Sequence, residues 1–251
     1  FKNEARFLGL NHKNIIVPVY YEIDKKCHVK GKKVSTSFTL TEYAPYGDFF
    51  DLTMNYTSIL SDIVIRTYFR QLIEGIEYLH SQKIAHLDLK LENLMIGKDF
   101  QLKIIDFDMS YKEGDKKVIS LGTRYYRAPE VANGAIINPM AADIFSAGII
   151  LFVLKSGGKI PQTENLYVQG VNLYQLLQND NKSFWQKHCE LQGKEDSYYS
   201  EEFRELFNMM TRGNPDERAT IESIKASKWY SGPVFSDDEL KAYMERHLSV
   251  N

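Results

Sequence analysis

Two loops rich in polar residues constrain the fold of this chain more than any other feature of its sequence. The first loop reads His86-Leu-Asp-Leu-Lys-Leu-Glu-Asn93, and thirteen residues later the apolar run Leu102 to Ile105 ends in Asp106-Phe107-Asp108. A single aspartate in a turn is more often a solvated or helix-capping residue than a catalytic one. Two acids and an amide in this arrangement indicate a fold that presents them together.

These side chains suit the transfer of a phosphoryl group. The reaction needs a carboxylate that orients and deprotonates the acceptor hydroxyl, and oxygen ligands that hold magnesium against the phosphates. Asp88, Asn93 and Asp106 provide such groups. Because Mg²⁺ prefers hard oxygen donors and keeps several waters, one carboxylate and one amide are enough when a nucleotide supplies other ligands. Lys90 can stabilise the charge on the transferred group.

The composition of the 251 residues fits one large globular unit or two closely packed lobes, because 43% of them are hydrophobic. The formal net charge of -2 gives no global attraction to nucleic acid or to an anionic membrane, so we expect neither partner. Cys27 and Cys189 lie in no Cys or His cluster, which favours free thiols. The longest apolar stretch, Ile144 to Leu154, is far shorter than the roughly 20 residues that span a bilayer, and it predicts a buried core helix.

Hydrophobic periodicity divides the chain into a small β-rich part and a large helical part. Glu4 to Leu10 is predicted as the tail of an amphipathic helix, followed by strands at Ile15 to Ile23 and Ser37 to Tyr43 with a solvated loop, Lys25 to Lys33, between them. The turn-rich stretch Ala44 to Asp48 marks the lobe boundary. The helices expected after it are Ile59–Ser81, Ala141–Lys155, Leu173–Gln178, Ser200–Met210, Ile221–Ala226 and Asp237–Leu248, the last with a capping box of Ser236 and Glu239.

In its motifs the chain resembles the eukaryotic protein kinase family, whose catalytic loop reads H-R-D-L-x-x-x-N and whose metal-binding turn reads D-F-G. Downstream, Gly122-Thr-Arg-Tyr-Tyr-Arg-Ala-Pro-Glu130 resembles the substrate-docking segment of that family. Asp143-Ile-Phe-Ser-Ala-Gly148 resembles the start of its central buried helix. The motifs follow in the family's order over essentially the whole chain. Small-molecule phosphotransferases share the Asp-to-Asn spacing but not the docking segment, so they are the weaker resemblance.

The resemblance implies an α+β, protein-kinase-like fold with two lobes. Residues 1–43 would form a partial β-rich N-lobe, residues 44–235 the hinge and a mainly helical C-lobe, and residues 236–251 a C-terminal helical tail. The implied activity is an ATP- and Mg²⁺-dependent serine/threonine protein kinase, because kinases of that specificity carry a lysine and a threonine at the positions of Lys90 and Thr123. The implied partners are protein substrates with Ser or Thr acceptors, in the cytoplasm or the nucleus, and the oligomeric state stays open.

The resemblance also implies roles for individual residues in catalysis. Asp88 would be the catalytic base, Lys90 would stabilise the transferred phosphoryl group, and Asn93 and Asp106 would bind the metal. The residues implied in ATP binding are Glu4, Thr41, Glu42, Ala44, Met95 and Asp106. Within this set, Glu4 would pair with a phosphate-binding strand lysine, and residues 42–44 would form the hinge.

Further residues are implied in substrate binding and in the support of the site. Asp48 and Glu92 would hold a substrate arginine, or they are plain surface acids, and Thr123 would link the docking segment to the catalytic base. The residues implied in support of the site are Leu8, Val19, His86, Phe107, Glu130, Asp143 and Arg218. The first four would stack in an apolar column that Asp143 anchors, and Arg218 would pair with Glu130.

The sequence departs from the family's pattern in three places. It begins too late to include the glycine-rich loop or the strand lysine, so we expect these residues alone to be a weak or inactive catalyst. Leu87 replaces an arginine that would pair with a phosphorylated activation loop, although Ser110, Tyr111 and Ser120 are candidate phosphorylation sites. Asp108 replaces the glycine of D-F-G, which predicts stiffer switching of this turn. The alternative function is a pseudokinase that binds or scaffolds without catalysis.

Overall fold

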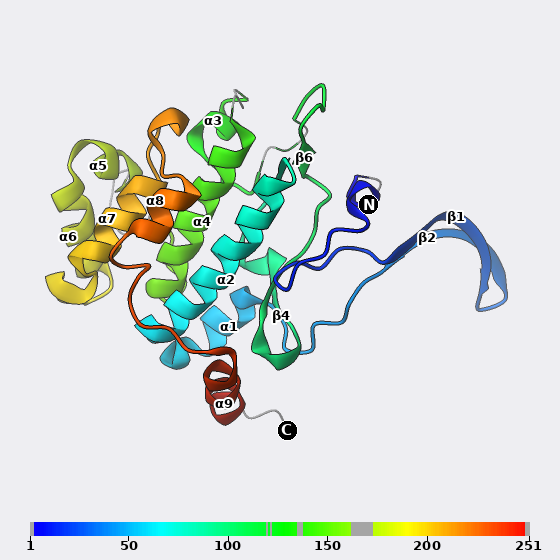
Figure 1. Cartoon of the computed structure of the whole chain (residues 1–251), viewed down its shortest axis with the longest axis horizontal. Coiled ribbons are helices and arrows are strands. Elements are labelled where there is room, and N and C mark those ends of the chain that lie inside the picture. The colour runs from blue at the N-terminus through cyan, green and yellow to red at the C-terminus, as the bar shows by residue number, and fades with distance from the viewer. Residues whose placement is uncertain (1–2, 119, 121, 135–137, 162–172, 249–251) are drawn as a thin grey trace.

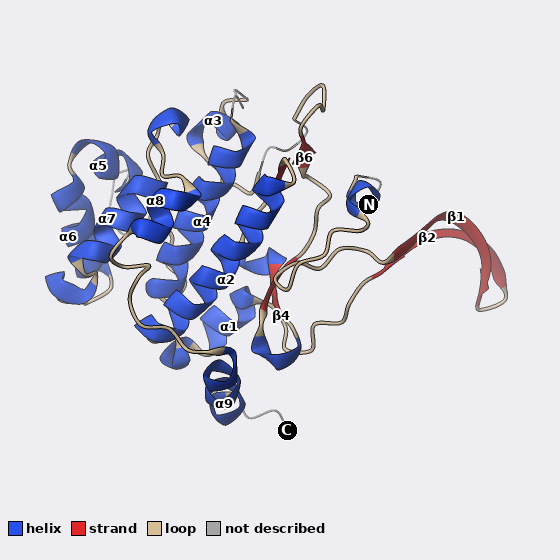
Figure 2. Cartoon of the chain, viewed as in Figure 1, coloured by secondary structure: helices blue, strands red, loops and turns tan. Residues whose placement is uncertain are grey.

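Helices form the body of the molecule, and a long two-stranded hairpin projects from one side of it (Figures 1 and 2). The computed structural model describes residues 3–118, 120, 122–134, 138–161 and 173–248. The helices, in chain order, are α1 (Phe49–Asn55), α2 (Asp62–Ser81), α3 (Pro129–Ala132), α4 (Pro139–Lys155), α5 (Leu173–Asn179), α6 (Asn181–Leu191), α7 (Glu201–Met210), α8 (Ile221–Ala226) and α9 (Asp237–His247). The mixed α+β architecture agrees with the fold class predicted from the motifs, whereas the domain boundaries stay predictions.

The core is built around α2 and α4, which pack against each other. Every residue of α4 from Ala142 to Leu154 is buried, as the continuous apolar run predicts. The predicted helices agree with the structure within two or three residues at their ends, but α1, α3 and α6 were not predicted. Helices α1 and α6 each follow an aspartate, Asp48 and Asp180, whose side chain accepts a hydrogen bond from a backbone N–H of the first turn. Among the described residues, no helix combines the length and the apolar character that would let it cross a membrane.

The hairpin joins β1 (Tyr20–Val29) to β2 (Lys32–Leu40) in antiparallel register, from Tyr20 opposite Leu40 to Val29 opposite Lys32. The predicted solvated loop at Lys25 to Lys33 is therefore wrong, because most of it is strand. Only Lys30 and Gly31 form the turn, with φ values of 49° and 76°, and left-handed backbone at both positions is typical of a two-residue hairpin turn. The hairpin is largely exposed, so its sequence lacks the alternation of apolar and polar residues that marks a half-buried strand.

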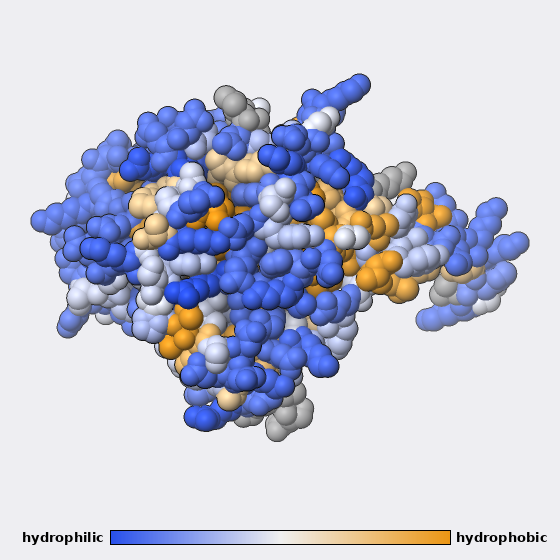
Figure 3. Space-filling view, viewed as in Figure 1, coloured by the Kyte–Doolittle hydropathy of each residue, from blue (hydrophilic) through white to orange (hydrophobic). Residues whose placement is uncertain are grey.

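Hydrophobic side chains reach the surface where the hairpin leaves the helical body (Figure 3). Leu8, Val19 and Leu40 have exposed fractions of 39%, 75% and 53%.

The first helical segment is shorter than predicted, because Glu4–Phe7 forms one turn of 3-10 helix instead of the tail of an α-helix. This difference changes which side chains reach the interior, as described for the site below.

Two short antiparallel pairs frame the polar loops. Strand β3 (Ile84–Ala85) pairs with β6 (Tyr111–Lys112), and β4 (Leu94–Ile96) pairs with β5 (Leu102–Ile104). The first loop lies between β3 and β4, and the second lies between β5 and β6. The pairings therefore bring the two loops side by side. The remaining 3-10 turns are Thr57–Ile59, Leu91–Asn93, Lys98–Phe100, Asp196–Tyr198 and Pro215–Glu217.

Helix α9 packs against the 3-10 turn Lys98–Phe100, which joins β4 to β5. Leu240 and Met244 of α9 are fully buried, and Lys241 forms an ion pair with Asp99 at 2.7 Å. The predicted capping box is confirmed, since Ser236 and Glu239 exchange side-chain and backbone hydrogen bonds. Helix α9 therefore packs against the turn of the β4–β5 hairpin, and the two polar loops lie at the other end of that hairpin.

Candidate active site

Alternating leucines hold the catalytic loop in place. Leu87, Leu89 and Leu91 are at most 5% exposed, so every second side chain points into the core. The side chains between them, Asp88 and Lys90, are only partly buried. The alternation therefore directs Asp88 and Lys90 toward the open side of the loop.

One buried carboxylate holds the backbone of this loop through hydrogen bonds. Asp143 of α4 is 1% exposed and accepts hydrogen bonds from the backbone N–H groups of His86 and Leu87, both at 2.8 Å, and it contacts Nε2 of His80 at 3.0 Å. A buried carboxylate needs such partners, since an unpaired buried charge costs several kcal/mol, on the order of 3–5. Asp143 therefore has the position predicted for an anchor.

His86 locks the loop through both nitrogens of its ring. Its Nδ1 accepts from the backbone N–H of Asp88 at 3.2 Å, and its Nε2 lies 2.8 Å from the carbonyl oxygen of Ile105. Since a carbonyl only accepts, Nε2 must donate, and the two bonds together require the neutral tautomer with its proton on Nε2. His86 thus ties the catalytic loop to the end of β5.

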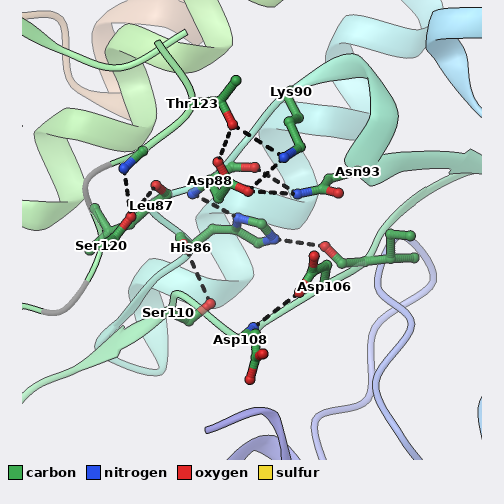
Figure 4. A network of polar contacts seen from close by, with 12 residues as sticks. His86, Leu87, Asp88, Lys90, Asn93, Asp106, Asp108, Ser110, Ser120 and Thr123 are labelled. Carbon is green, nitrogen blue, oxygen red and sulfur yellow. Dashed lines mark hydrogen bonds and ion pairs between the residues drawn. The ribbon is translucent and has the colours of Figure 1, made fainter. Parts of the chain in front are cut away.

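Three side chains converge on the carboxylate of Asp88 (Figure 4). Thr123 donates its hydroxyl to Oδ1 at 2.7 Å, and the Lys90 ammonium lies 2.9 Å from Oδ2 and 3.2 Å from the Thr123 hydroxyl. The amide nitrogen of Asn93 donates to the backbone carbonyl of Asp88 at 2.9 Å and to Oδ2 at 3.2 Å. The structure thus brings together the four residues predicted from two motifs that lie about 30 positions apart in the chain, 93 to 123.

The β4–β5 hairpin brings Asn93 close to Asp106. Asn93 precedes β4 and Asp106 follows β5 by two positions, and the backbone N–H of Ile105 donates to the carbonyl of Asn93 at 3.0 Å. Asp106 is exposed and has a φ of 64°, and its Oδ1 accepts from the backbone N–H of Asp108 at 3.2 Å. The amide oxygen of Asn93 points away from Asp88 (Figure 4).

This donor set fits Mg²⁺ better than a transition metal. Within the described ranges, no group of three or more His, Cys, Asp or Glu residues is placed to hold a metal by itself. One carboxylate and one amide oxygen are hard ligands, and they leave positions for waters and phosphate oxygens, as Mg²⁺ prefers. The pair Asn93 and Asp106 is therefore suited to a metal that arrives with a nucleotide.

All six residues predicted to bind ATP line one cleft of about 420 Å³: Glu4, Thr41, Glu42, Ala44, Met95 and Asp106. The volume lies within the ~300–1,000 Å³ range of small-molecule sites. Tyr43, which lies within the predicted hinge, also lines the cleft, whereas Ile16 and Ile105 were missed, although both belong to apolar runs that the sequence displays. The carboxylate of Glu42 forms an ion pair with Lys103 at 3.1 Å. Because the side chain of Glu42 is engaged in this pair, its backbone is the part that can bind a ligand in the cleft.

Glu4 enters the cleft beside the metal-binding turn. Burial, and after it the nearby carboxylate of Asp106, raise the pKa of Glu4 above its ordinary value. A cation placed between Glu4 and Asp106 would relieve this repulsion. The geometry therefore leaves Glu4 available for the pairing with a lysine that the resemblance implies.

The apolar column differs from the prediction at two of its four positions. Phe7, which is 2% exposed, packs on Phe107 with ring centroids 5.7 Å apart, and Phe107 packs on His86 at 5.1 Å. Leu8 and Val19 were predicted members, but both are exposed. The reason for the first difference is helical phase, because residues three apart share a face of a 3-10 turn and Phe7 therefore follows Glu4 inward.

The metal-binding turn and the segment after it also differ from expectation. Asp108 is not among the residues with a positive φ, so the backbone here does not require glycine at this position; the left-handed residue is Asp106. Ser110 and Ser120, predicted as candidate phosphorylation sites, are only 1% and 2% exposed. In this arrangement neither hydroxyl is accessible to another kinase.

Glu130 and Arg218 form a buried ion pair under the docking segment. The two guanidinium nitrogens lie 2.6 Å and 3.0 Å from the two carboxylate oxygens, and the side chains are 0% exposed for Arg218 and 9% for Glu130. Arg218 also donates to the backbone carbonyls of Ala141 and Arg212. The predicted pairing is therefore present in the structure.

The two acids predicted to hold a substrate arginine have different surroundings. Asp48 caps α1, because its Oδ1 accepts from the backbone N–H of Asp51 at 2.8 Å. Glu92 is exposed and lies near Tyr126 of the docking segment, where its charge, after burial, contributes to raising the pKa of the Tyr126 hydroxyl. Of these two acids, Glu92 is therefore the exposed one beside the docking segment.

Comparison with known proteins adds an independent observation. A family model described as the protein kinase domain matches residues 2–230. CBL-interacting protein kinase 11 from Oryza sativa subsp. japonica is 33% identical over 205 residues, which are 80% of this chain and 38% of that protein. The probable serine/threonine-protein kinase MARK-A from Dictyostelium discoideum is 30% identical over 232 residues, which are 92% of this chain and 20% of that protein. The chain thus spans less than half the length of these relatives.

Proposed function

Because the chain belongs to the protein kinase family, we propose that its protein transfers the γ-phosphoryl group of ATP to serine or threonine hydroxyls of protein substrates. The observation that carries the proposal is the arrangement at Asp88, where Thr123, Lys90 and Asn93 all hold one carboxylate. A carboxylate fixed in this way cannot rotate freely, so its orientation toward an incoming hydroxyl is set before the substrate arrives. The relative from Dictyostelium is named as a probable kinase of the same specificity.

Asp88 acts as the base in this mechanism. It accepts the proton of the substrate hydroxyl while the new O–P bond forms and the bond between the γ-phosphorus and the bridging oxygen of ADP breaks. Lys90 lies beside Asp88 and stabilises the negative charge of the transferred group. Thr123 belongs to the docking segment, so its hydrogen bond to Asp88 couples substrate binding to the orientation of the base.

Asn93 and Asp106 would hold Mg²⁺, which neutralises phosphate charge when it is bound with the nucleotide. Residues 42–44 line the cleft, and their backbone would bind the adenine edge, with Met95, which also lines the cleft, beneath the ring. Glu4 would orient a phosphate-binding lysine. Glu4, residues 42–44, Met95 and Asp106 line the same cleft, which supports their joint assignment to ATP binding.

The pseudokinase alternative is not favoured. A scaffold does not need a base, a phosphate-stabilising cation and two metal ligands, and Asp88, Lys90, Asn93 and Asp106 are all present. Leu87, which departs from the family's usual arginine, is buried in the core and leaves the carboxylate of Asp88 in place. The departures in sequence therefore do not disturb the four reactive side chains.

Glu92 is our candidate for the recognition of a basic residue in the substrate, and Asp48 is assigned to capping. Glu92→Gln removes the charge but keeps the size of the side chain. We expect it to raise KM for a peptide with arginine near the acceptor by ~1.4- to 5-fold, which corresponds to the ~0.2–1 kcal/mol typical of an exposed pair. A peptide without arginine serves as the control, and an equal effect on both peptides would exclude this role.

The test of the proposed function is phosphate transfer from ATP to a peptide library with Ser, Thr or Tyr acceptors, in the presence of Mg²⁺. The assay uses the full-length gene product beside its Asp88→Asn variant. We expect transfer to Ser and Thr acceptors, and a loss of ~10²- to 10⁴-fold in the variant, since this is the usual contribution of a general base. Equal rates for both proteins, or transfer to Tyr alone, would refute the proposal.

A further inference from the structure

Two buried serines tie the segment between Asp106 and Thr123 to the catalytic loop. Ser110 donates its hydroxyl to the carbonyl of His86 at 3.2 Å, and Ser120 donates to the carbonyl of Leu87 at 3.0 Å (Figure 4). The two acceptors are consecutive residues of the catalytic loop. The segment is therefore fastened near both of its ends to the peptide units that immediately precede Asp88.

Ser120 also organises the residues that follow it. Its oxygen accepts a hydrogen bond from the backbone N–H of Gly122 at 2.9 Å, so one hydroxyl bridges the catalytic loop and the docking segment. The next residue, Thr123, donates to Asp88. The hydroxyls of Ser120 and Thr123 thus bond two adjacent residues of the catalytic loop, Leu87 and Asp88 respectively.

The backbone on both sides of this bridge has uncommon geometry. Leu87 has a φ of 62°, which a residue with a branched side chain rarely adopts, and Gly122 has a φ of 61°. A Cβ atom at Gly122 would lie 2.8 Å from the Cβ of Arg127, so only glycine fits there. Such conformations persist where the surrounding contacts over-determine them, which is typical of functional sites.

We propose that Ser120 is a positioning residue that holds Thr123 against Asp88, and that its hydroxyl keeps the docking segment in the productive arrangement without phosphorylation. The inference rests on the proposed kinase function. It follows from the burial of Ser120 and from its two bonds, because the hydroxyl already has a donor and an acceptor partner. A phosphate on this oxygen would remove the donated hydrogen and place negative charge against the carbonyl of Leu87.

Substitution of Ser120 separates this role from general stability. Ser120→Ala leaves the Leu87 carbonyl without its donor, and we expect kcat/KM for the peptide substrate to fall roughly 10- to 100-fold, while the affinity for ATP stays unchanged. Ser120→Thr restores a hydroxyl and is expected to recover most of the rate. Ser156→Ala is the matched control, since Ser156 is also buried but bonds the carbonyls of Val153 and Lys159, away from the site.

Treatment of the wild-type protein with a broad-specificity phosphatase tests the second half of the proposal. We expect full retention of activity after the phosphate groups are removed. Loss of activity, together with phosphate found on Ser120 in the active protein, would overturn the proposal. A wild-type rate in Ser120→Ala, with the same melting temperature, would overturn it as well.

Amide hydrogen exchange of Gly122 gives a readout that does not depend on catalysis. In ¹⁵N-glycine-labelled protein, the Gly122 amide should exchange slowly in the wild type and in Ser156→Ala, and at least 10-fold faster in Ser120→Ala. Unprotected Gly122 in the wild type would refute the bridge even if the protein is an active kinase. Protected Gly122 in a protein without transferase activity would instead refute the proposed function and keep the bridge.

Discussion

Replacement of Arg218 by methionine should destabilise the fold more than any other single charge removal discussed here. The guanidinium is fully buried, pairs with both oxygens of Glu130 and donates to the backbone carbonyls of Ala141 and Arg212. It also lies 5.2 Å from the ring centroid of Phe145. Arg218→Met keeps the apolar stem of the side chain and removes its charge, so Glu130 becomes a buried carboxylate without its cation.

The size of the effect follows from this burial. Removal of one partner of a buried ion pair costs about 3–5 kcal/mol, because the remaining charge stays desolvated. For a domain of this size each kcal/mol lowers Tm by roughly 2–4 °C, so we expect Tm to fall by roughly 6–20 °C. The double variant Arg218→Met, Glu130→Leu removes both charges and should be more stable than Arg218→Met alone.

Urea unfolding followed by the fluorescence of Trp185 and Trp229 measures these differences. Arg212→Ala is the matched control, because Arg212 reaches Glu217 only at 3.9 Å and the two side chains are 52% and 62% exposed. An exposed pair of this kind contributes at most ~1 kcal/mol. If Arg218→Met costs less than ~1 kcal/mol, or if the double variant costs the sum of its single variants, the ion pair is not the buried and coupled unit described here.

Three further predictions concern the acid limb of stability, the last helix and the docking segment. Burial lowers the pKa of His188 from its ordinary value of 6.5 to about 4. As the pH falls from 6.5 to 4, the unfolded chain therefore takes up a proton before the folded one does, and about 3 kcal/mol of stability should be lost. The unfolding free energy of His188→Gln, measured in urea, should depend less on pH, and the same pH dependence as in the wild type would contradict this assignment. Leu240→Ala in α9 should cost ~2–5 kcal/mol of unfolding free energy, since Leu240 is fully buried. In the same urea titration Lys241→Ala, which removes only an exposed ion pair, should cost much less, and equal costs would mean that α9 is not packed on the core. Thr123→Val should lower kcat while it preserves the binding of ATP measured by calorimetry, and a normal kcat would show that the hydrogen bond to Asp88 does not orient the base.

The parts of the fold that were predicted correctly depend on short-range patterns. Helical spacing over many residues predicted α2, because an apolar face repeated every three or four positions leaves little choice of structure, and a continuous apolar run predicted α4 as a buried core helix. The resemblance of the motifs to those of protein kinases predicted which residues meet at Asp88, and the capping box of α9 followed from Ser236 and Glu239 alone. The helices and the capping box are each encoded within a few turns of the chain.

The parts that were predicted wrongly depend on exposure. The β1–β2 hairpin lies away from the helical body, so its charged strands resemble a loop in sequence. Leu8 and Phe7 are adjacent and both apolar, and only the 3-10 geometry of Glu4–Phe7 decides which of them reaches Phe107. No local pattern records this choice.

The sequence by itself determined the chemistry of the site, because the identity and order of Asp88, Lys90, Asn93 and Asp106 follow directly from the chain. The tertiary structure decided how these residues are held. From the sequence, Ser120 was a candidate phosphorylation site, which requires an accessible hydroxyl. In the structure, packing against Leu87 buries this hydroxyl and gives its oxygen two backbone partners. The physical reason is that residue type and spacing fix local backbone geometry, whereas burial and the hydrogen bonds between distant segments arise only when the whole chain has packed.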